Sequence, residues 1–113
     1  ALGGTCVIWG CIPAKSLLES ASLANKLKHA GDHGITLGEV KLDFAPAMKR
    51  SRAVSTQNSK GVEFLFKKNK VTYVKGTGKL TNPTTVCVTL TDGKTESHTA
   101  KKAVLVSTGS KVK

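Results

Sequence analysis

The sequence is poor in acidic and in aromatic residues. Seven Asp and Glu stand against 18 Lys and Arg, giving a formal net charge of +11, and aromatic residues make up 4% of the 113 residues. Such a charge raises a nucleic acid or an anionic membrane as a partner. The basic residues are scattered, however, and their two densest groups, residues 49–52 and 67–70, each lie near a predicted helix with an apolar face. We interpret both groups as solvated helix surface and predict no nucleic-acid partner.

Long apolar runs, internal repeats and low-complexity tracts are also lacking. No segment approaches the roughly 20 apolar residues that a membrane span needs, so we predict no membrane partner. The apolar share of 39% and the charged share of 22% are typical of an ordinary folded domain. A chain of this length predicts one domain with one core.

The two ends of the sequence carry features that usually lie inside a domain. A glycine-rich segment with a cysteine pair follows Ala1 at once, and an apolar run, Ala103–Val106, comes shortly before Lys113. Domains seldom begin at their active site. We therefore expect this chain to be a piece of a longer protein.

Two helices are predicted in the first part of the chain. Pro13 suits a first turn, and Leu17, Ala21 and Ala24 recur at helical spacing, which predicts a helix over 12–30 that ends near Gly31 and Gly34. A strand-like or irregular stretch follows over 35–42. Asp43 is a suitable N-cap for a second, longer helix, and its apolar positions are expected at Phe44, Ala47, Met48, Val54, Val62, Leu65 and Phe66.

After Lys70 the apolar pattern alternates, as it does in strands. Residues 71–74, 85–90 and 96–99 are predicted as strands of a β-meander, with Asp92-Gly93 as a hairpin turn. Ala103–Val106 is wholly apolar and leads into Ser107-Thr108-Gly109-Ser110, which is typical of a buried parallel strand delivering a loop at its carboxyl end. The predicted class is α/β: two helices, then a meander and a parallel strand.

Cys6 and Cys11 are the residues with the clearest chemistry. In a continuous helix their Cα atoms would be about 8 to 9 Å apart, whereas a disulfide needs about 4.4 to 6.8 Å. The pair can close only if the backbone between them leaves the helix, and Gly10 can absorb that change. A disulfide formed in this way near a helix N-terminus is typical of redox catalysis.

Three other interpretations of the cysteines stay open. Free thiols are often small core residues, which suits Cys87 in its alternating segment. Cys6-x4-Cys11 followed by His29-x3-His33 has the ligand types of a zinc site, and a zinc-stabilised or basic nucleic-acid binder is the alternative from another class; the gap of 17 residues exceeds that of a zinc finger. A structural disulfide of a secreted protein fits poorly with an odd cysteine count.

The segment from Gly3 to Lys15, Gly-Gly-Thr-Cys-Val-Ile-Trp-Gly-Cys-Ile-Pro-Ala-Lys, closely resembles the active-site segment of the pyridine nucleotide-disulfide oxidoreductases. The Ile-Pro-Ala-Lys ending, the stretches over 33–43 and 66–71, and Gly76-Thr77-Gly78-Lys79 are most similar to the dihydrolipoamide dehydrogenase branch of that family. Val7-Ile8-Trp9 departs from it, because the family commonly has a small or polar run there. The resemblance implies that residues 1–113 are part of a Rossmann-like FAD-binding domain.

The resemblance also implies a role for each matching residue. Cys6 would be the thiol that exchanges with the substrate disulfide, and Cys11 the thiolate beside the flavin. Lys15, one turn later, would lie near the flavin; its plainer interpretation is a surface lysine. The positions expected to contact FAD are Gly4, Thr5, Cys6, Lys15, Gly78, Thr108, Gly109 and Ser110.

Other parts of the expected enzyme would lie outside this sequence. The family's Gly-x-Gly-x-x-Gly fingerprint is expected upstream, and the NAD and dimerisation domains downstream. The implied activity is oxidation of dihydrolipoamide, held on a carrier protein of a 2-oxo acid dehydrogenase complex, with electrons passing to NAD. A homodimer in the mitochondrial matrix or the bacterial cytoplasm is expected. Mercuric or glutathione reductase is the alternative within the family.

Overall fold

The computed structural model describes residues 1–110 and divides the chain into two units, residues 1–69 and a second that begins at Lys70. The first unit is helical and the second holds a β-sheet. Within the described residues, no helix is both long enough and apolar enough to cross a membrane. The combination of helices and sheet agrees with the predicted α/β class, although the described sheet is antiparallel.

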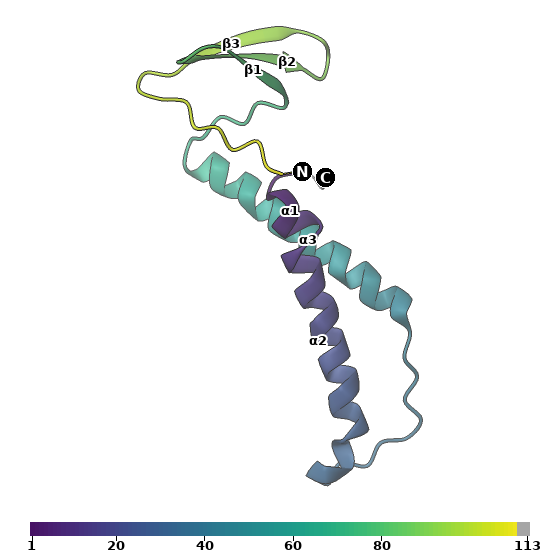
Figure 1. Cartoon of the computed structure of the whole chain (residues 1–113). Helices are drawn as coiled ribbons and strands as arrows, with labels where there is room; N and C mark the ends of the chain where they lie inside the picture. The colour runs from purple at the N-terminus through teal and green to yellow at the C-terminus, as the bar shows by residue number, and fades with distance from the viewer. Residues whose placement is uncertain (111–113) are drawn as a thin grey trace. The chain divides into compact units, whose positions relative to one another are not determined.

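The first unit contains three α-helices: α1 (Gly4–Ile8), α2 (Cys11–Lys28) and α3 (Phe44–Lys68). The helices α2 and α3 cross, and α1 lies at the crossing in contact with both (Figure 1). The two long helices were expected from their periodicity. The short helix α1 was not, because its five residues are too few to show a helical period.

The ends of α2 and α3 follow local signals. The helix α2 ends two residues earlier than expected and passes into a 3₁₀ turn, η1 (Ala30–His33), which Gly34 ends in the left-handed conformation with φ 72°. Residues 35–42 are irregular. The expected N-cap of α3 is confirmed, because the Asp43 carboxylate accepts a hydrogen bond of 2.9 Å from the amide of Ala45.

Serine, not a large apolar side chain, occupies the buried positions of the two long helices, apart from Pro13 of α2. Ser51, Ser55 and Ser59 are buried on α3 and Ser16 is buried on α2. The Ser51 hydroxyl donates to the carbonyl oxygen of Met48 at 2.9 Å, which satisfies it within the helix. The small side chains of serines at steps of four allow close packing on this face of α3, where the Ser55 hydroxyl is buried without a hydrogen-bond partner.

The prediction of a buried apolar face on α3 is therefore only partly correct. Phe44 and Leu65 are 69% and 53% exposed, whereas Met48 and Val54 are half-buried. Among the apolar residues of 1–110, only Ala30 and Pro13 are buried. The expectation of one apolar core is thus not met within the part of the chain that the structure describes.

The second unit holds the meander β1 (Gly76–Asn82), β2 (Thr85–Leu90) and β3 (Thr95–Thr99), antiparallel in that order (Figure 1). The strands expected over 85–90 and 96–99 are confirmed. The strand expected over 71–74 is wrong, because that segment is irregular and β1 begins later. The turn after Asn82 sets the register, in which Gly76 pairs with Leu90, the last residue of β2; the segment before Gly76 therefore has no strand beside it.

Two further expectations concern the end of the meander. The Asp92-Gly93 turn is confirmed: Gly93 has φ 85°, and the amide of Leu90 donates to the carbonyl oxygen of Lys94 at 2.8 Å. Residues 103–106, expected as a parallel strand, have no strand assignment. A parallel strand needs a neighbour of the same direction, and the only sheet in the described residues is antiparallel.

Asp43→Ala should weaken the start of α3. The loss of an N-cap acceptor costs about 0.5–2 kcal/mol, so amides of the first turn should exchange with deuterium several-fold faster in the protein that contains this chain. Hydrogen exchange followed by mass spectrometry over residues 44–50 measures this. Asp43→Asn retains the acceptor and should exchange like the parent; equal acceleration in both variants would contradict the capping role.

Candidate redox-active disulfide

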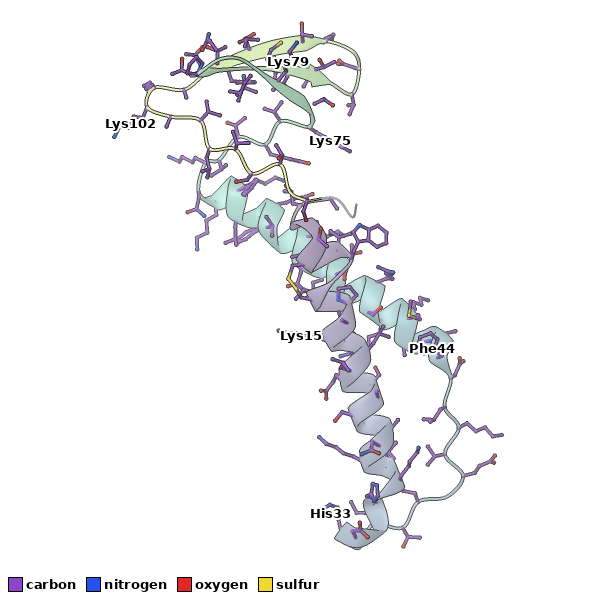
Figure 2. All side chains as sticks on the ribbon, in the orientation of Figure 1. Lys15, His33, Phe44, Lys75, Lys79 and Lys102 are labelled. Carbon is purple, nitrogen blue, oxygen red and sulfur yellow. A yellow bond between two sulfur atoms is a disulfide. The ribbon has the colours of Figure 1, made fainter. Side chains whose placement is uncertain are left out.

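Cys6 and Cys11 are joined by a disulfide at the N-terminal end of α2, seen as the yellow bond in Figure 2. Their Cα atoms are 4.6 Å apart, much closer than a continuous helix would allow. The expected break in the helix is present, because α1 ends at Ile8 and α2 starts at Cys11. Both cysteines are exposed.

One carbonyl group organises the turn between the cysteines. The carbonyl oxygen of Thr5 accepts hydrogen bonds from the amides of Trp9, at 2.9 Å, and Gly10, at 2.7 Å. The second bond spans one residue more than an α-helical bond, so the chain leaves the helix here and begins α2 in a new direction. A Cβ at Gly10 would lie 3.2 Å from this oxygen. Glycine therefore permits the close approach on which the turn depends.

Two glycines with positive φ, Gly3 and Gly4, come before the cysteine pair in the chain. Gly3 has φ 114° and Gly4 has φ 60°. A Cβ at Gly3 would collide with the side chain of Val7, whereas the space beside Gly4 is open. The double glycine thus brings the chain tightly into α1 and leaves the backbone at Gly4 open to an approaching group.

The local electrostatics favour a thiolate at Cys11. Cys11 is the first residue of an 18-residue helix, where the helix dipole stabilises negative charge. Lys15 lies one turn later, so its side chain is on the same face as that of Cys11. It is exposed, and Figure 2 shows it extending from α2 on the side where the disulfide lies.

Trp9 and Arg52 form a contact that our sequence analysis missed. The guanidinium carbon of Arg52 lies 5.1 Å from the centre of the Trp9 ring, and its Nη1 donates to the carbonyl oxygen of Ile8 at 3.3 Å. Arg50, two residues earlier on α3, donates from Nη1 to the backbone and side-chain oxygens of Ser16, at 3.2 and 2.8 Å. These two arginines connect α3 to the neighbouring helices. Arg50 and Ser16 are 34 residues apart in the sequence, and Arg52 and Ile8 are 44 apart. No local sequence pattern could therefore predict these contacts.

The disulfide and the Trp9 ring belong to different surroundings. Trp9 and Ile8 border an open groove of about 470 Å³ whose other wall is α3, with Ser55 and Ser59 among its residues. Neither cysteine lines this groove. Ile8 and Trp9, which lie between the cysteines in the sequence, therefore contact α3. The two sulfur atoms lie on another part of the surface.

The residues expected at a cofactor site fall into two groups. Gly4, Thr5, Cys6, Cys11 and Lys15 lie together at α1 and the start of α2. Gly78 of β1 and residues 108–110 belong to the second unit, where Gly109 has φ 81°. The structure thus places Gly4, Thr5, Cys6, Cys11 and Lys15 close together. Gly78 and residues 108–110 are described as part of the second unit.

The remaining cysteine and the histidines have separate environments. Cys87 is a free, half-buried thiol of β2. Nδ1 of His29 lies 3.6 Å from a carboxylate oxygen of Asp32, and both side chains are largely exposed. Residues 1–110 contain no cluster of three or more potential metal ligands, and the sulfurs of Cys6 and Cys11 are bonded to each other.

The family model for pyridine nucleotide-disulphide oxidoreductases matches residues 1–113. The chain belongs to this family. Its relatives within the family include dihydrolipoyl dehydrogenases. It is 47% identical to dihydrolipoamide dehydrogenase of Chaetomium thermophilum over 98% of this chain, and 47% identical to dihydrolipoyl dehydrogenase of Cupriavidus necator over 99%.

The mitochondrial dihydrolipoyl dehydrogenase of Pisum sativum is 43% identical over the whole chain. The matched regions make up 22%, 23% and 23% of the Chaetomium, Cupriavidus and Pisum proteins. This chain thus spans less than a quarter of the length of these relatives.

Gly10→Ala should make the disulfide harder to form. The added Cβ would press against the Thr5 oxygen, so the turn must open and the cysteines must separate. We expect disulfide formation, when oxidised dithiothreitol is added to the reduced protein as the two-electron acceptor, to slow about tenfold, a change of about 1.4 kcal/mol in the barrier, as measured by timed alkylation of free thiols. Gly61→Ala is the control, because a Cβ there meets no atom within 4 Å; equal slowing would contradict the role of Gly10.

Proposed function

We propose that this chain is the redox-disulfide part of the FAD-binding domain of a dihydrolipoyl dehydrogenase-like enzyme. Cys6 and Cys11 would carry electrons from dihydrolipoamide toward FAD and then NAD. The observation that supports this most directly is the Cys6–Cys11 bond at the start of α2, in a chain of this family. The names of the relatives supply the proposed substrate.

Residues of each unit have features that suit a flavin cofactor. Gly4 leaves open space where other residues would have a Cβ, and Cys11 and Lys15 place a sulfur and a cation on one face of α2. Gly109 has a positive φ and no atom where its Cβ would stand, which also suits close approach of a ligand to the backbone. We propose Gly4, Thr5, Cys6, Lys15, Gly78, Thr108, Gly109 and Ser110 as the residues of this chain that hold FAD.

Thiol–disulfide exchange by the two cysteines follows from their positions. One sulfur of dihydrolipoamide attacks Sγ of Cys6; a mixed disulfide forms, the Cys6–Cys11 bond breaks, and Cys11 leaves as a thiolate. The second substrate thiol then attacks the first, closing the lipoamide disulfide and releasing Cys6 as a thiol. The substrate loses two electrons and two protons; the cysteine pair gains the two electrons, Cys6 takes one proton, and the other proton goes to solvent.

The start of α2 explains why Cys11 is assigned as the leaving sulfur. The helix dipole and the nearby Lys15 ammonium both stabilise the negative charge that develops on it. A better leaving thiolate speeds the exchange. FAD, when bound, supplies a two-electron acceptor, and NAD is the proposed final acceptor.

The rest of the proposal concerns the whole protein. Its substrate would be dihydrolipoamide on a carrier protein of a 2-oxo acid dehydrogenase complex, and the enzyme would be a homodimer. The Pisum relative is mitochondrial by name and the Cupriavidus relative is bacterial. We accordingly propose the mitochondrial matrix or the bacterial cytoplasm as its location.

The test is a reductive titration of the full-length protein with dihydrolipoamide, followed by visible absorbance. The expected result is flavin absorbance and, after two electrons, a long-wavelength band from a thiolate next to the flavin. Glutathione disulfide with NADPH and mercuric ion with NADPH are assayed in parallel as substrates of the sibling reductases. Absence of flavin, or turnover with a sibling substrate alone, would overturn the proposal.

Two cysteine variants should separate the roles of the pair. Cys11→Ser should abolish the long-wavelength band, because no thiolate remains at the start of α2. Cys6→Ser should retain the band but lower dihydrolipoamide oxidation by at least about a thousandfold, since substrate exchange has no sulfur to attack. The reverse pattern would show that the two roles are exchanged.

A further inference from the structure

Arg52 of α3 makes two contacts with the four residues that separate the cysteines. Its Nη1 donates to the carbonyl oxygen of Ile8 at 3.3 Å, and its guanidinium lies 5.1 Å from the centre of the Trp9 ring. The backbone amide of Trp9 donates to the Thr5 carbonyl oxygen, as does that of Gly10. A residue 44 positions away thus contacts the same turn that brings Cys6 and Cys11 together.

We propose that Arg52 is a positioning residue for the redox pair, acting through Ile8 and Trp9 to keep the two sulfurs close when the disulfide is open. The inference rests on the proposed reversible redox role of the pair. It adds a residue outside the active-site segment. It also gives a role to Trp9, which stands where the family commonly has a small or polar residue.

The physical argument concerns the reduced state. Reduction breaks the Cys6–Cys11 bond and adds two electrons and two protons. Cys6 is left as a thiol, and Cys11 gives its proton to solvent and is left as a thiolate, as in the exchange above. The turn is then held only by non-covalent contacts, which include the Thr5 hydrogen bonds and the contacts from Arg52. A turn that stays closed keeps the thiols at a high effective concentration and so favours re-formation of the disulfide. Loss of Arg52 should let the reduced turn open and thereby favour the dithiol.

A purely electrostatic role for Arg52 predicts the opposite result. Removal of a cation near a thiolate disfavours the reduced, charged form, which would shift the equilibrium toward the disulfide. The two roles therefore predict shifts of opposite sign, and the sign of the shift distinguishes them. The positioning effect does not depend on ionisation of a sulfur and should have the same sign at pH 6 and pH 8.

The experiment measures the dithiol–disulfide equilibrium of the full-length protein in mixtures of reduced and oxidised dithiothreitol. Each reduced dithiothreitol loses two electrons and two protons to one Cys6–Cys11 bond, and alkylation with mass spectrometry gives the reduced fraction. We expect Arg52→Met to lower the equilibrium constant for disulfide formation about three- to tenfold at pH 6 and pH 8. The tenfold limit corresponds to about 30 mV.

Lys49→Met and Arg50→Met are the matched controls. Both remove one positive charge from α3, and Arg50 contacts Ser16 of α2 instead of the turn. Each control should leave the equilibrium constant within about twofold of the parent. Trp9→Leu should give part of the Arg52 effect, and the double variant should show less than the sum of the two single changes, because both remove one shared contact.

The outcomes distinguish this inference from the function on which it rests. If the parent pair cannot be reduced and re-formed reversibly, the proposed function fails and the inference fails with it. If the parent pair is reversible but Arg52→Met is unchanged, shifted the opposite way or matched by Lys49→Met, the positioning role alone is overturned. If Arg52→Met does not fold, full retention of the parent equilibrium by Trp9→Leu overturns it.

Discussion

The first unit depends on joining two cysteines five positions apart at the start of a helix. A continuous helix would hold their Cα atoms too far apart, so the chain ends one short helix and starts another between them. The Thr5 carbonyl oxygen makes this change possible by accepting two amides, the second from Gly10. The short length of α1, the start of α2 and the glycine at the junction all follow from this one closure.

Features governed by neighbouring residues could be predicted from the sequence. The cysteine geometry, the Asp43 cap and the Asp92-Gly93 turn each depend on a few adjacent positions. The strand expected over 71–74 was wrong because strand limits depend on the partner strand, and the register after Asn82 places the partner elsewhere. The assignment of residues to FAD came from family resemblance, and it stays a prediction.

The packed face of α3 shows a second limit of sequence patterns. Apolar periodicity favoured residues such as Phe44 and Leu65, but serines at steps of four occupy the buried positions. Serine gives no apolar signal, yet its small side chain allows helices to approach, and its hydroxyl can bond within its own helix. Large apolar side chains of the first unit are exposed in this chain, which spans less than a quarter of the length of its relatives.

The turn between the two cysteines has two sides with different requirements under the proposed function. Thiol–disulfide exchange needs accessible sulfurs, and both cysteines are exposed. The turn between them must nevertheless be held, because a closed geometry that relied on the disulfide alone would be lost on each reduction. The contacts of Ile8 and Trp9 with Arg52 involve neither sulfur. Arg52 of α3 thus contacts the backbone of Ile8 and the indole of Trp9, and these contacts constrain the cysteines without covering the sulfur atoms.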